Sequence, residues 1–295
     1  MDQALAPPST GMGFLNLHWI LQGVDAMLAV HADLQRLLLE ALGMPGKRDR
    51  ILVSVFVDDN ARQLETINAV RKGMSVAAQH KMRIKYALNL VKSAAISKEL
   101  EVARAKIYLE EVIGEIERSS EVNNTHTGSW PLDQDSHHYR KLKLEKKSNI
   151  STIASKAIEA NLVSSLVLGA LLVALDCSAG LSITPAIPIP KNLSGGFPSL
   201  WEELKEEAEA RRGNRWSSAF LEGICSCLGQ IAALLDSLLR NKARRDDDEL
   251  QIKQLLQLAH KKLDYLDSGF QILEEQMGDL FSKMVANRKE ILSIA

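Results

Sequence analysis

The sequence predicts an all-α protein, a bundle of long antiparallel helices that ends in one long helix with a heptad pattern. Apolar residues recur at helical spacing along most of the chain, and no convincing strand alternation appears. Aromatic residues make up only 5% of the 295 residues, and this composition, rich in Leu, Ala, Glu and Lys, favours helices over sheets. The third observation is a 3.5-residue apolar repeat near the C-terminus, formed by Ile252, Leu256, Ala259, Leu263, Leu266, Phe270, Leu273, Met277, Leu280, Met284, Asn287 and Ile291.

This C-terminal seam predicts one helix of about 60 Å, at 1.5 Å rise per residue. Asn287 is its single polar position and is expected near the point where the helix leaves the bundle. A second seam precedes it within 217–243, formed by Leu221, Ile224, Leu228, Ile231, Leu235 and Leu238. Because the connection between the two is short, we expect an antiparallel hairpin inside the bundle. The oligomeric state stays open, since such seams also pack between chains.

The chain divides into a disordered N-terminus over 1–13 and a single helical domain over 14–295. Within that domain, helices are expected over 14–120, an apolar helix over 150–180, and further helices over 199–295. Residues 121–149 are polar, charged and turn-rich, and predict a mobile linker.

The N-terminal helices follow from their periodicity and their end signals. The first, 14–42, stops at Gly43 and Pro45. The second covers about 52–93, with Gly73 as a candidate bend or break. The third covers about 97–119, and its inward face is expected to carry Leu100, Ala103, Ile107, Ile113 and Ile116. After the apolar helix, Ser199 is expected to cap a short helix that ends at Arg211.

The stretch 160–175 contains no charged residue, and the chain stays largely apolar to Ile183. Its length lies between that of a buried core helix and that of a membrane span, so both interpretations stay open. A basic run precedes it and is either a solvated face or a contact with anionic lipid. The candidate membrane contacts are Arg140, Lys141, Lys143, Lys146, Lys147, Leu166, Leu168, Leu171 and Leu172. Nucleic acid is not an expected partner, because the net charge is −1 and no aromatic residues interleave the basic run.

No catalytic, cofactor-binding or metal-binding residue is assigned. The segment GMPGK lacks the first glycine of a phosphate loop, which is Ala41 here, and no strand precedes it. Cys225 and Cys227 diverge by about 200° on a helix and cannot share one ion. His31 lies on an apolar face and is expected to be a hydrogen-bonded core histidine. Three cysteines suit a reducing compartment, and the N-terminus lacks a secretory or transit signal, so a cytoplasmic protein is expected. The basic run beside the apolar segment adds the expectation of membrane association.

The order of these parts resembles the plant-specific BYPASS/ROH-like family. The apolar helix LVSSLVLGALLVALDCSAGL is followed by the Pro-containing loop and Glu/Lys-rich helix of LSITPAIPIPKNLSGGFPSLWEELKEEAEARRG. The ending, LDSGFQILEEQMGDLFSKMVANRKEIL, is similar to the family's closing pattern of paired acids, Leu-Phe, and Arg before a final Leu. The opening, NLHWILQGVDAMLAVHADLQRLL, carries the His-x-Asp-Leu element from His31 to Leu34.

The resemblance implies a non-enzymatic regulator of plant growth and development. It implies contact with other proteins, among them an exocyst subunit in secretion, and action at the cytoplasmic face of membranes. It defines no catalytic residues and no cofactor. The alternative is a single-pass membrane protein that uses 160–183 as its anchor.

Overall fold

The structure, a computed structural model, describes residues 16–42, 50–94, 99–123, 148–175, 197–211, 218–240 and 245–294. Within these ranges every element is a helix and none is a strand, which confirms the all-α prediction. The helices are α1 (Leu17–Leu42), α2 (Arg50–Ala94), α3 (Glu99–Asn123), α5 (Ser148–Ala174), α6 (Phe197–Arg211), α7 (Ala219–Arg240) and α8 (Arg245–Ile294).

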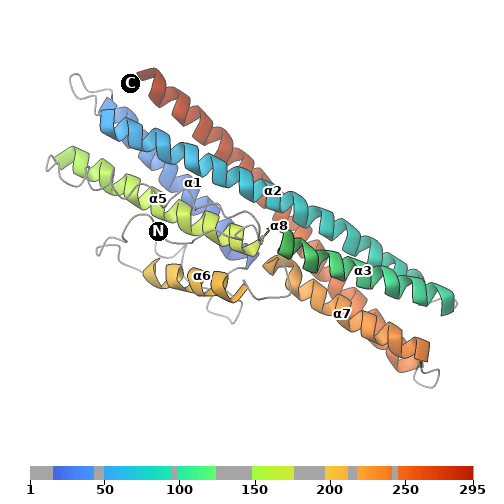
Figure 1. The fold of residues 1–295 in the computed structure, drawn as a ribbon. Coiled ribbons are helices and arrows are strands. Elements are labelled where there is room, and N and C mark those ends of the chain that lie inside the picture. The colour runs from blue at the N-terminus through green and yellow to red at the C-terminus, as the bar shows by residue number, and fades with distance from the viewer. Residues whose placement is uncertain are drawn as a thin grey trace.

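Two long antiparallel helices, α2 and α8, run the length of the molecule and organise the others (Figure 1). Along one half of their length, α2 and α8 form a four-helix bundle with α1 and α5. Along the other half, they form a second four-helix bundle with α3 and α7. The two halves therefore share α2 and α8. At the junction, the Ser218 hydroxyl donates a hydrogen bond to the carbonyl of Ala174, which ties the start of α7 to the end of α5 (2.8 Å).

The C-terminal seam lies in the core, as the sequence predicts. All its residues are buried, from Ile252 at 0% exposed to Ile291 at 0%. Asn287 is also buried, so α8 stays within the bundle at that point and the expectation that it leaves there is wrong. The hairpin of α7 and α8 is confirmed, because Phe220 and Phe270 pack edge to face with ring centroids 5.4 Å apart.

Helix α5 is buried on all sides over 160–175. It contacts α1 and α2 on the bundle side and α6 on the other, so no long face meets solvent. Helix α6 supplies this cover with Leu200, Trp201, Leu204 and Ala208, all buried. An all-apolar helix requires either such enclosure or a lipid environment, and this fold provides the enclosure.

Several local expectations need correction. Helix α2 continues through Gly73 without a break. Helix α6 begins at Phe197, so Ser199 lies inside it rather than capping it. Helices α3 and α5 extend into both ends of the expected linker, to Asn123 and from Ser148. The remainder of that linker, 124–147, and the expected disordered terminus lie outside the described residues.

The inward face of α3 also differs from the prediction. Leu100 and Ile107 are each 64% exposed. The buried face is formed instead by Val102, Ala105, Leu109, Val112 and Ile116. Ile116 is the one residue that both sets share.

Substitution by alanine at two glycines of α8 should change the free energy of unfolding in opposite directions. A Cβ at Gly269 would overlap Leu17 Cδ2 and lie 2.8 Å from Leu17 Cγ, whereas a Cβ at Gly278 would meet nothing within 4 Å. Gly278→Ala should therefore raise the free energy of unfolding by about 1 kcal/mol through helix propensity. Gly269→Ala should lower it by about 1 kcal/mol, because overpacking costs about 1–3 kcal/mol and exceeds that gain. Urea denaturation of both variants measures the difference, and equal stabilisation would contradict the close packing of α1 on α8.

Candidate functional site

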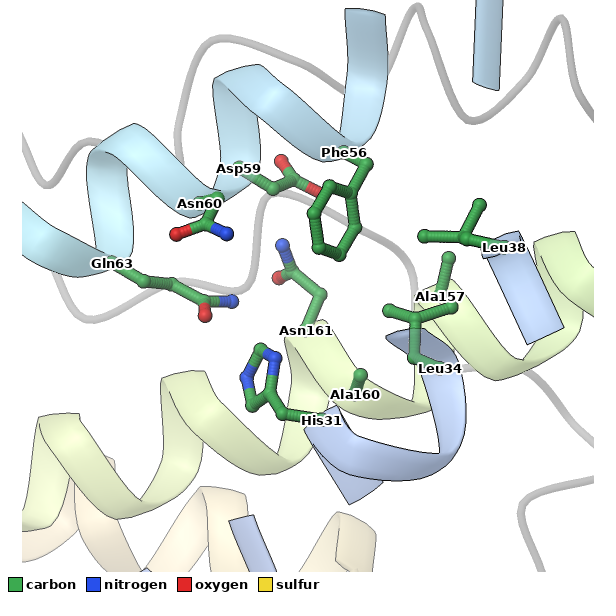
Figure 2. Close-up of a pocket in the computed structure, with 10 residues that line it drawn as sticks. All are labelled: His31, Leu34, Leu38, Phe56, Asp59, Asn60, Gln63, Ala157, Ala160 and Asn161. Carbon is green, nitrogen blue, oxygen red and sulfur yellow. The ribbon is translucent and has the colours of Figure 1, made fainter. Parts of the chain in front are cut away.

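A small cavity lies between α1, α2 and α5 (Figure 2). The volume of this cavity is about 20 Å³. Its lining combines polar and apolar side chains from all three helices. They are His31, Leu34, Leu38, Phe56, Asp59, Asn60, Gln63, Ala157, Ala160 and Asn161.

His31 enters this region from α1 and bonds to α5. The Ser164 hydroxyl donates its only proton to the carbonyl of Ala160 (2.8 Å). His31 Nε2 lies 2.7 Å from Ser164 Oγ, so the two side chains are hydrogen-bonded, and with the Ser164 proton on Ala160 the Nε2–H tautomer of His31 is the donor. Burial lowers the pKa of His31 to about 4 because the charged imidazolium would lose its hydration. His31 is therefore a neutral, hydrogen-bonded core histidine, as predicted.

Two amide side chains of α2 complete the polar cluster. Asn60 Nδ2 donates to the carbonyl of Met284, which links α2 to α8 (3.2 Å). Asn60 Oδ1 and Gln63 Oε1 are buried, and neither accepts a hydrogen bond from a protein group. Both residues are more than nine-tenths buried. A cavity of this volume has about the size of one water molecule and is too small for an organic ligand.

The Ser164–His31 pair has the spacing of a nucleophile and its general base. Its surroundings do not suit that chemistry, however. Ser164 is 0% exposed, its proton is held by Ala160, and the nearby cavity is too small for a substrate. The pair instead fixes the register of α1 against α5 through one buried hydrogen bond.

The two described cysteines are buried thiols of α7. Burial is the largest cause that raises the pKa of Cys225 to about 12, with the carboxylate of Glu117 adding to it, so the reactive thiolate is suppressed. Cys227 donates to the carbonyl of Gly223 (3.3 Å). No group of three or more His, Cys, Asp or Glu side chains in the described residues is arranged to hold a metal ion.

A wider groove lies on the surface between α2 and α8. Met74 and Phe270 contribute buried apolar atoms to it, and Lys81 pairs with Asp267 across it. Lys81 also lies over the Phe270 ring, with Nζ 5.8 Å from the centroid. Its basic residues, Arg71, Lys72 and Lys81, lie on α2, and the acidic residues Asp267 and Glu274 lie on α8, so the two walls carry opposite charges and the net charge of the groove is small.

The structure places the predicted membrane-contact leucines in the core. Leu166 and Leu171 are 0% exposed, and Leu168 and Leu172 are almost as fully buried. The basic residues Arg140, Lys141, Lys143, Lys146 and Lys147 lie outside the described residues. Among the described residues, α7 is the one helix long and apolar enough to cross a membrane, whereas the apolar part of α5 is shorter; one face of α7 packs in the core.

Exposed apolar side chains gather on the outer face of α2 and α3, a surface that the sequence pattern did not reveal. We call it the α2–α3 patch and define it by the exposed Met82, Tyr86, Leu100 and Ile107, together with the half-buried Tyr108. Met82 is 71% exposed and Tyr86 55%. Tyr86 and Tyr108 pack edge to face across the two helices, with centroids 5.1 Å apart. Leu100 and Ile107 of this set were expected in the core.

Comparison with known proteins returns no match to a protein-family model, to a curated protein or to a solved structure.

Proposed function

We propose that this protein is a non-enzymatic plant regulatory adaptor of the BYPASS/ROH-like type, acting through protein–protein contacts in growth and development. The sequence resemblance is the support for this family, and the family is the reason for the proposed link to exocyst-dependent secretion. Its site of action is the cytoplasmic face of membranes, supported by the basic run from Arg140 to Lys147.

The observation that best supports an adaptor is the α2–α3 patch. Most soluble proteins scatter their exposed apolar residues, whereas a group of them on neighbouring helices is typical of a binding surface. Aromatic and methionine side chains are also enriched at the centres of protein interfaces. The patch lies on two packed helices joined by the Tyr86–Tyr108 contact and by the Arg83–Glu115 ion pair, so a partner would meet a rigid surface.

The double variant Tyr86→Ser, Ile107→Ser should weaken binding to a purified exocyst subunit at least about tenfold, because each truncation removes an exposed anchor side chain. Calorimetric titration of each recombinant subunit in turn measures the affinity. Leu292→Ser is the matched control, since Leu292 is 53% exposed but lies near the end of α8, away from the patch. Unchanged binding by the double variant would overturn the role of the patch. Absence of binding to every subunit would overturn the exocyst link.

A further inference from the structure

A second heptad stripe runs along the outer face of α8, opposite its core seam. It consists of Leu258, Lys261, Tyr265, Ser268, Ile272, Glu275 and Asp279, spaced alternately by three and four residues. Every one of these side chains is exposed, including Tyr265 at 57%, Ile272 at 47% and Leu258 at 44%. We call this set the outer stripe. It covers about 30 Å of helix at 1.5 Å per residue.

The charges of the outer stripe are separated along the helix. Lys261 lies before Tyr265, whereas Glu275 and Asp279 lie after Ile272. Lys261, Glu275 and Asp279 form no ion pair with any described residue of the chain. The stripe therefore carries one basic residue before Tyr265 and two acidic residues after Ile272, and none of the three is ion-paired with a described residue.

From this pattern we propose that the outer stripe is a self-association surface, on which a second copy of the chain packs in antiparallel orientation. The reversed orientation sets Lys261 of each copy against the acidic residues Glu275 and Asp279 of the other, and Tyr265 close to Ile272 of the second copy. A parallel pair would set like charges together and is disfavoured. Ser268 at the centre is small enough to allow the two helices to approach closely.

The symmetry of this arrangement determines the size of the assembly. Each copy presents the same surface, so the contact closes as a two-fold dimer and does not propagate into a filament. Only three positions of the stripe are apolar, and the contact is limited to one helix on each copy. Such an interface belongs to the small, reversible class, and its affinity depends on salt because its charges lie at the surface.

Charge reversal and mixing test the proposal. Sedimentation velocity from about 1 to about 200 µM should show a reversible monomer–dimer equilibrium for the wild type, shifted to monomer by added salt. Lys261→Glu should weaken dimerisation at least about tenfold, and so should the double variant Glu275→Lys, Asp279→Lys. An equimolar mixture of the two variants should dimerise again, because the reversed ends are complementary to each other.

Arg104→Glu is the control, since it reverses an exposed charge on α3, which lies diagonally across the bundle from α8. Its dimerisation should match the wild type, and far-UV circular dichroism should show equal helicity for all variants. A wild type that stays monomeric throughout would overturn the proposal. Dimers indifferent to reversal of Lys261, or mixed variants that fail to associate, would do the same.

Discussion

Leu171→Ala should lower the free energy of unfolding by about 2–5 kcal/mol. Leu171 is 0% exposed near the C-terminal end of α5, in the stretch that is enclosed by α1, α2 and α6. Removing its side chain deletes apolar contacts and leaves a cavity that the surrounding helices can close only in part. Chemical denaturation followed by far-UV circular dichroism measures the loss. The matched control is Leu292→Ala, which truncates the same residue type at a site 53% exposed and should change stability by about 0.5 kcal/mol or less.

This comparison distinguishes the two interpretations of the apolar segment. If 160–175 is core, the purified chain unfolds cooperatively in aqueous buffer and Leu171→Ala shifts that transition far more than Leu292→Ala. If 160–183 is a membrane anchor, the chain requires detergent and the two substitutions have similar, small effects on the soluble part. The second result would overturn the packed position of α5 and favour the single-pass alternative.

The core of α8 could be predicted because its pattern is unambiguous. One apolar stripe with a single polar interruption defines one buried face, and the second seam in α7 identifies its neighbour. Helix α3 was harder because apolar residues lie on two faces. Leu100 and Ile107 form one helical row, and Val102 and Leu109 form another at the same spacing. Which row is buried depends on how α3 meets α2 and α7, and periodicity alone contains no such information.

The cluster of polar side chains beside the cavity shows a similar limit. The apolar setting of His31 predicted a hydrogen-bonded core residue, which is confirmed, but its partner Ser164 is 133 residues away in the chain. Ser164 and Asn161 lie within an apolar run, where short polar side chains give little signal of a buried network. Asn60 and Gln63 come from a third helix, so only the packing of α1, α2 and α5 brings the cluster together.

Acidification should destabilise the fold through His31. Its pKa is about 4 in the folded chain, against 6.5 for an exposed imidazole, so the unfolded state binds a proton first as the pH falls. The stabilisation from the neutral ring is complete above about pH 6.5 and is lost as the pH falls toward 4. Between pH 7 and pH 5 the linkage amounts to about 2 kcal/mol. Urea denaturation at both pH values measures the total change.

The contribution of His31 is isolated by His31→Gln, which keeps an amide donor for Ser164 but cannot be protonated in this range. Other groups also contribute to the total, and His80 acts in the same direction because burial lowers its pKa as well. These groups remain in the variant, so the difference in pH dependence between wild type and His31→Gln should be about 2 kcal/mol over the same interval. Identical pH dependence in the two proteins would mean that the imidazole reaches solvent in the native state. The buried hydrogen bond between α1 and α5 would then no longer explain how these two helices are held in register.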